Sequence, residues 1–116
     1  MSVTIYGIKN CDTMKKAFTW LKDRDVAYDF HDYRALGIDA KTIKAWVTEL
    51  GWEKVLNKAS TTFKELAESD KTDLDEAKAI QLMVQYPTMI KRPVLVDGAS
   101  VTTGFKPDIY DSLFRR

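Results

Sequence analysis

The chain has 116 residues, with 18 lysines and arginines against 17 aspartates and glutamates and a formal net charge of +1. We expect residues 1–116 to form a single domain with a real hydrophobic core, and the ordinary apolar and charged fractions exclude a disordered or fibrous protein. The balanced charge leaves no basic excess for sequence-independent binding to nucleic acid. No apolar run approaches membrane-spanning length and no signal-peptide pattern begins the chain, so we expect no membrane partner. We also expect no nucleic-acid partner and a monomeric protein.

Cysteine and histidine each occur once, as Cys11 and His31. A single cysteine cannot form an internal disulfide, which suits a reducing compartment, and we expect a cytoplasmic protein. One cysteine and one histidine are also too few for a structural zinc site, so we predict no metal. His31 follows a predicted strand, where a hydrogen-bonded or surface histidine is a more common outcome than a catalytic base.

The N-terminal part of the chain predicts a strand, a helix and a second strand. Residues 3–8 are mostly apolar and short enough for a strand inside a sheet. The following helix ends near residues 23–25 and has one apolar face, formed by Met14, Ala17, Phe18 and Leu21. Val26, Tyr28 and Phe30 then alternate with polar residues, as in a strand. This order is a βαβ unit, in which the two strands run parallel.

Residues 39–85 change to a helical period, and we predict a helical insertion there. Asp39 is placed to cap its first helix, which Gly51 would end, with inward residues Ile43, Trp46, Val47 and Leu50. Two short helices follow, around residues 52–56 and after Ser60. A capping box of Asp73 and Glu76 would open the last helix, with inward residues Ala77, Ile80, Met83 and Val84.

The C-terminal part returns to strands. Residues 94–96 form an apolar strand, Asp97-Gly98 favours a tight hairpin turn, and residues 101–103 would be the partner strand. Pro107 is suited to the first position of a final helix, whose inward residues would be Tyr110, Leu113 and Phe114. The whole order is βαβ, helices, then ββα. It predicts an α/β fold with a mixed four-stranded sheet.

Cys11 stands where the first strand runs into the first helix. Backbone N–H groups without intrahelical partners, and the positive end of the helix dipole, would favour its thiolate there. Lys9, Lys15 and Lys16 act in the same direction, whereas Asp12 opposes them. The alternative is that Cys11 is a small buried hydrophobic residue, which is a common fate of a lone cysteine. The residues alone leave both interpretations open.

A cysteine after the first strand and a proline before the third are typical of the thioredoxin-like arrangement. The chain resembles the arsenate reductase and Spx-like (ArsC) family, in particular its YffB-type members, which are thiol reductases. The resemblance covers nearly the whole chain. Its matching segments are Ile5-Tyr6-Gly7 to Cys11-Asp12-Thr13, Leu56-Asn57-Lys58 with Thr61 to Lys64, Pro87 through Ile90-Lys91-Arg92-Pro93-Val94, and Gly104-Phe105-Lys106-Pro107 with Tyr110 to Phe114.

The resemblance implies a set of site residues around Cys11. It implies a cis peptide at Arg92–Pro93 near Cys11, with backbone beside it that can pair with an extended peptide such as glutathione. It also places the Arg92 guanidinium over the active cysteine, where it suits a thiolate, an oxyanion or a carboxylate. The remaining candidate ligand-binding residues are Lys9, Asn10, Lys15, Lys58 and Lys106. For Asn10, a role in orienting a ligand and a role in ending the strand are equally favoured.

The chain departs from the family pattern at several positions. Arsenate reductases of the family hold their oxyanion with further arginines, where this chain has Lys58 and Lys106. Lysine keeps the charge but lacks the planar fork that fits an oxyanion. The Spx-like redox switch is a Cys-x-x-Cys pair, but this chain has Met14 three residues after Cys11. The chain therefore favours a mechanism in which its single thiol reacts and a thiol of another molecule resolves the intermediate.

We therefore expect a glutathione-dependent thiol reductase that forms a mixed disulfide between Cys11 and glutathione. Glutathione would be a co-substrate and no cofactor would be tightly bound. The substrate would be a small thiol, disulfide or oxyanion, and glutaredoxin would be a further partner. The alternatives are an arsenate reductase, and a non-catalytic Spx-like regulator that binds another protein.

Overall fold

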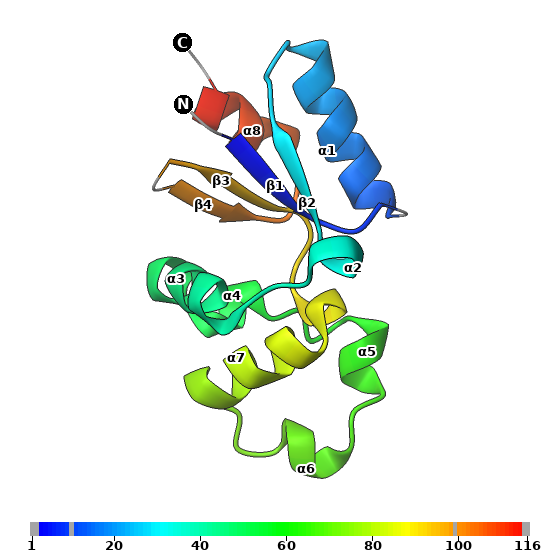
Figure 1. The fold of residues 1–116 in the computed structure, drawn as a ribbon, viewed down its shortest axis with the longest axis vertical. Helices are drawn as coiled ribbons and strands as arrows, with labels where there is room; N and C mark the ends of the chain where they lie inside the picture. The colour runs from blue at the N-terminus through cyan, green and yellow to red at the C-terminus, as the bar shows by residue number, and fades with distance from the viewer. Residues whose placement is uncertain (1–2, 10, 99, 115–116) are drawn as a thin grey trace. The chain divides into compact units, whose positions relative to one another are not determined.

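A computed structural model describes residues 3–9, 11–98 and 100–114 of the chain. It divides into two compact units, one of residues 1–32 with 92–116 and one of residues 33–91. Figure 1 shows a sheet with helices in the first unit and helices alone in the second. The predicted insertion, residues 39–85, lies within the second unit. That residues 1–116 form a single domain stays a prediction.

The first unit contains a four-stranded mixed sheet in the order β2-β1-β3-β4. β1 (Val3–Gly7) pairs in parallel with β2 (Asp29–Asp32) and antiparallel with β3 (Val94–Asp97). β3 in turn pairs antiparallel with β4 (Ser100–Thr103). The connection from β1 to β2 is the helix α1 (Asp12–Asp23). The predicted βαβ unit and mixed sheet are thereby confirmed.

The second strand begins later than the sequence pattern indicated. Val26 and Tyr28 alternate as predicted, but the ladder with β1 starts only at Asp29. The end of α1 accounts for the difference, because the Val26 N–H still donates to the Leu21 carbonyl at 2.9 Å. Val26 and Tyr28 instead pack beside the core of this unit without joining the sheet.

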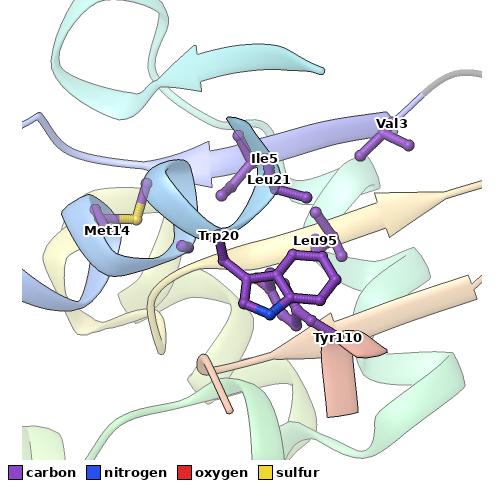
Figure 2. Packing of buried hydrophobic residues seen from close by; sticks show 8 residues of the cluster. Val3, Ile5, Met14, Trp20, Leu21, Leu95 and Tyr110 are labelled. Atoms are coloured by element: carbon purple, nitrogen blue, oxygen red, sulfur yellow. The ribbon is translucent and has the colours of Figure 1, made fainter. Parts of the chain in front are cut away.

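The core of the first unit lies between one face of the sheet and the helices α1 and α8 (Pro107–Phe114). Ile5 and Leu95 are paired across β1 and β3 and therefore point to the same face. Figure 2 shows Trp20 of α1 beside Tyr110 of α8, with ring centroids 5.5 Å apart in an edge-to-face arrangement. The buried cluster consists of Val3, Ile5, Met14, Ala17, Trp20, Leu21, Leu95 and Tyr110.

The C-terminal elements follow the sequence pattern closely. The β3–β4 hairpin pairs Asp97 with Ser100, and Gly98 between them has φ of +60°, a conformation that favours glycine. Residue 99 lies outside the described residues. Pro107 begins α8 as predicted, and Tyr110 is fully buried. Leu113 and Phe114, also predicted inward, pack beside the core as half-buried residues.

The second unit is built from short helices around its own apolar residues. Asp39 accepts a hydrogen bond from the Thr42 N–H at 2.8 Å, and Gly51 follows the helix with φ of +91°, so the predicted start and end of this helix are confirmed. Ser60 caps a later helix by accepting from the Phe63 N–H at 3.2 Å. The elements are α2 (Tyr33–Leu36), α3 (Ala40–Leu50), α4 (Trp52–Val55), α5 (Thr61–Lys64), α6 (Glu68–Lys71), α7 (Glu76–Gln85) and the 3₁₀ turn η1 (Pro87–Met89).

The predicted cap and buried face of α7 are wrong. The residue that caps α7 is Asp75, which accepts from the Lys78 N–H at 2.8 Å, whereas Asp73 has a left-handed backbone with φ of +54°. The inward residues are Ala79, Leu82 and Met83. Of the residues predicted inward, Met83 is buried, Ile80 is half-buried, and Ala77 and Val84 are exposed. Two apolar stripes share this helix, and packing against the other helices selects one of them.

Within the described ranges, no helix combines the length and apolarity needed to cross a bilayer.

We predict a pH-dependent stability from Tyr110. Burial raises the pKa of this fully buried phenol above its ordinary value. Above a pH of about 10 the unfolded chain loses this proton while the folded chain keeps it. The free energy of unfolding should therefore be undiminished below that pH and fall above it, by at most about 1.4 kcal/mol per pH unit.

Urea denaturation of the wild type and of Tyr110→Phe, at several pH values from about 9 to 11, measures this effect. The difference in unfolding free energy between the two proteins should change with pH, because the variant lacks the phenol. A difference that stays constant over this range would contradict the prediction.

We also predict that the packing of Met14 requires a glycine at position 7, the last residue of β1. A Cβ at position 7 would overlap the Sδ and Cε atoms of Met14, which is fully buried. Gly7→Ala should therefore lower the free energy of unfolding by about 1–3 kcal/mol. In a Met14→Ala background the same change should cost much less, because the space is free. An equal cost in both backgrounds, measured by urea denaturation, would exclude the steric explanation.

Candidate functional site

Cys11 is the residue that caps the N-terminus of α1. Its backbone is extended, with φ of −140° and ψ of 127°, and its carbonyl accepts the Lys15 N–H at 3.0 Å. The thiol is free and makes no capping hydrogen bond. The side chain is half-buried and packs beside the core cluster. Cys11 is thus neither sealed in the core nor fully exposed, and it lies at the positive end of a helix.

The strand register brings three separate chain segments to the edge of the sheet where Cys11 lies. Val94, the first residue of β3, pairs with Tyr6 near the end of β1 and with Thr103 at the end of β4. The segments that follow β1, precede β3 and follow β4 therefore leave the sheet at the same edge. They contain Cys11, Arg92–Pro93 and the loop of residues 104–106.

The Arg92–Pro93 peptide bond is cis, as the family resemblance implied. Pro93 is buried, and its carbonyl accepts the Gly104 N–H at 2.9 Å, so this bond joins the segment before β3 to the loop after β4. Arg92 is half-buried. Among the ion pairs formed by the described residues, none involves Arg92. Its guanidinium therefore remains available to an anion.

The loop of residues 104–106 links β4 to α8. Gly104 has φ of +78°, and the Lys106 carbonyl accepts the Ile109 and Tyr110 N–H groups at 3.0 and 3.1 Å. The Lys106 side chain is exposed. The half-buried Phe105 contacts Tyr110 edge to face, with centroids 4.8 Å apart. Our sequence reasoning passed over Phe105, although an aromatic residue just before a predicted helix and beside a candidate lysine was a usable signal.

The other predicted site residues divide between the two units. Lys9 and Lys15 are exposed in the first unit, and Asn10 lies outside the described residues. Lys58 belongs to the second unit, where its Nζ lies 5.4 Å from the centroid of the Trp52 ring. The first unit therefore assembles most of the predicted set by itself, whereas Lys58 is held by a different group of helices.

His31, at the same sheet edge, contacts Tyr6 in a tilted arrangement, with ring centroids 4.8 Å apart and an interplanar angle of 36°. In the part of the chain that the structure describes, no three His, Cys, Asp or Glu side chains gather as a metal-binding group. This edge also carries the free thiol of Cys11 and the cationic side chain of Arg92. Such an arrangement is suited to nucleophilic attack by sulfur and to binding of an anionic group.

Comparison with known proteins shows which family the chain is similar to. The family model described as the ArsC family matches residues 6–113. A solved structure described as the YFFB (PA3664) protein is 58% identical, with a TM-score of 0.94 over 96% of this chain and 97% of that one. A solution structure of an arsenate reductase (ArsC) related protein from Brucella melitensis is 49% identical, with a TM-score of 0.78 over 100% of this chain and 97% of that one.

A more distant similarity concerns regulators. The global transcriptional regulator Spx of Streptococcus agalactiae is 25% identical over 108 residues, which are 91% of this chain and 78% of that protein. The Spx match covers 91% of this chain and the two solved structures 96% and 100%, and a likeness to a glutaredoxin structure agrees with a thioredoxin-like α/β architecture.

Proposed function

Because the chain belongs to the ArsC family, we propose that it is a glutathione-dependent thiol reductase that uses the single thiol of Cys11. Its similarity to an arsenate reductase-related structure supports an oxidoreductase in the coarser sense. The observation that carries the finer proposal is the position of Cys11. The free, half-buried thiol of Cys11 stands at the N-cap position of α1, at the sheet edge from which the Arg92–Pro93 segment also emerges.

The proposed reaction is three successive thiol–disulfide exchanges. The Cys11 thiolate attacks one sulfur of a substrate disulfide, so that a mixed disulfide forms and the other substrate sulfur leaves as a thiolate. Glutathione then attacks Cys11, releases the second substrate thiol and leaves glutathione bound to Cys11. A second glutathione frees Cys11 as oxidised glutathione forms. One substrate disulfide is reduced and two glutathione molecules are oxidised.

In this proposal each cation that the family resemblance singled out in the first unit has a role. Arg92 and the N–H groups of the first turn of α1 stabilise the thiolate, and Lys15 adds to that field. The backbone beside Pro93 pairs with the extended glutathione chain. Lys9 and Lys106 attract its carboxylates, whereas the roles of Asn10 and Lys58 stay predictions from the family resemblance. The proposed reaction takes place in the cytosol and uses only the thiol of Cys11, without a bound cofactor.

We predict a mixed disulfide with glutathione on Cys11. After incubation with oxidised glutathione, intact-mass spectrometry should show one adduct, which Cys11→Ser abolishes. Arg92→Ala should slow adduct formation by about tenfold, because a charge-assisted contact to the thiolate is lost. Lys22→Ala is the matched control, since Lys22 lies in the last turn of α1 and should leave the rate unchanged.

Two results would count against the proposal. One is the absence of any adduct from the folded protein when the urea-unfolded protein forms one readily. The other is an Arg92→Ala rate equal to that of the control.

Arsenate reduction is the second candidate, and the 49% identity to an arsenate reductase-related protein favours it. Lys106 offers a point charge where a planar fork would fit the oxyanion better. We therefore expect arsenate to oxidise glutathione more slowly than a disulfide substrate does, in an assay with glutathione, glutaredoxin and glutathione reductase. Lys106→Arg should raise the arsenate rate specifically. If arsenate is instead the faster substrate, and Arg92→Ala abolishes its turnover, arsenate reduction becomes the leading function.

A further inference from the structure

A groove of about 350 Å³ runs along the outer side of α1, beside the loop before α8. One wall is formed by Phe105. The other is the helix surface of Lys15, Lys16, Thr19, Trp20, Asp23 and Arg24, and we call this feature the α1 groove. All its lining residues belong to the first unit. The proposed reaction does not require it.

The α1 groove is positively charged. Lys15, Lys16 and Arg24 are exposed and face a single carboxylate, Asp23. Across the described ranges, no ion pair neutralises any of these three cations. The Arg24 guanidinium instead stacks on Trp20, 4.2 Å from the ring centroid, which holds its position while its N–H groups remain open to an anion.

The inner surface of the groove is apolar and aromatic. Trp20 is 7% exposed and Phe105 is half-buried, so Phe105 offers most of the accessible aromatic surface and Trp20 only a narrow part of its side chain. Both rings contact Tyr110 in the core, with centroids 5.5 and 4.8 Å from its ring. The α1 groove thus combines a packed aromatic floor with exposed cationic side chains at its rim.

The groove also has the length of a short extended segment. The helix residues that line it extend from Lys15 to Arg24, which is about 14 Å along the helix axis. About four residues of extended chain cover that distance. One end lies at the first turn of α1, where the Lys15 N–H bonds to the Cys11 carbonyl. A chain that occupies the groove therefore approaches Cys11.

We propose that the α1 groove binds an acidic, extended segment of a partner protein, in which carboxylates pair with the rim cations and an apolar side chain covers Trp20 and Phe105. The partner presents a sulfur beside its acidic segment to Cys11, and this second part rests on the proposed function. The net charge of +1 argues against nucleic acid as the occupant. The shallow, elongated shape with charge on its rim fits a peptide.

Fluorescence anisotropy with a labelled peptide of glutamates around one leucine tests the binding. The wild type should bind this peptide, more weakly as salt rises, and should not bind the counterpart with lysines in place of glutamates. Lys16→Glu should weaken binding by about tenfold. Lys22→Glu is the matched control, because it makes the same charge change on the same helix outside the α1 groove and should alter affinity by less than about twofold. Equal weakening by both variants would overturn the proposed groove.

Exchange with a peptide disulfide tests the link to Cys11. The acidic peptide is given a cysteine whose sulfur carries thionitrobenzoate. Attack by Cys11 forms the protein–peptide disulfide and releases thionitrobenzoate, whose absorbance gives the rate. The acidic peptide should react about tenfold faster than its lysine counterpart with the wild type, and this advantage should disappear in Lys16→Glu. Equal rates for both peptides would overturn the assignment of the groove to the exchange partner.

These experiments distinguish a failure of the proposed reductase function from a failure of the proposed docking site. Adduct formation with oxidised glutathione needs no docked peptide, so Arg24→Glu, which alters the α1 groove at the end of the helix away from Cys11, should retain it. An adduct without peptide binding refutes the docking site alone. Peptide binding without an adduct on Cys11 in any variant refutes the reductase and leaves a protein-binding groove.

Discussion

The antiparallel pairing of β1 with β3 is the constraint on which the candidate site depends. The two strands are far apart in sequence, and nothing local brings Cys11 near the Arg92–Pro93 segment. The register of Tyr6 with Val94 does so, because it aligns the end of one strand with the start of the other. The sheet is buried on this side by α1 and α8, so a slip by one residue would turn Ile5 and Leu95 away from the core. Core packing therefore protects the geometry of the site.

Two further contacts complete this edge. The hydrogen bond from Gly104 to Pro93 attaches the loop after β4 to the segment before β3, so that Lys106 and Phe105 follow the same scaffold. Phe105 then contacts Tyr110, which also contacts Trp20 beneath the outer surface of α1. One aromatic cluster thus supports both the loop at the candidate active site and the α1 groove. The residues proposed to take part in binding and catalysis lie mostly on short connections, while the residues that position them are in the core.

Much of the architecture could be predicted because its signals are local. Asp39, Gly51 and Pro107 act within one turn of their own helices, and each stands where the sequence indicated. The error in the buried face of α7 arose where distant packing decides. α7 has two apolar stripes, and only contacts with other helices choose the one containing Leu82. For the site, the family resemblance identified Arg92 and Pro93, which no periodicity would have selected. Phe105 has its role only because the sheet edge and α8 surround it, so the sequence alone did not reveal it.

The contact between Gly7 and Met14 has a consequence for how such proteins diverge. Met14 stands where the resemblance to Spx-like proteins would place the second cysteine of a Cys-x-x-Cys pair, and its thioether lies against the backbone of Gly7. A cysteine there would be shorter and would leave a void beneath the first turn of the helix. Gain of a local disulfide is therefore tied to repacking at the end of the neighbouring strand. A change between one-thiol and two-thiol chemistry on this scaffold should therefore involve positions 7 and 14 together. Selection there would act on the volume of the packed side chains as well as on the redox potential.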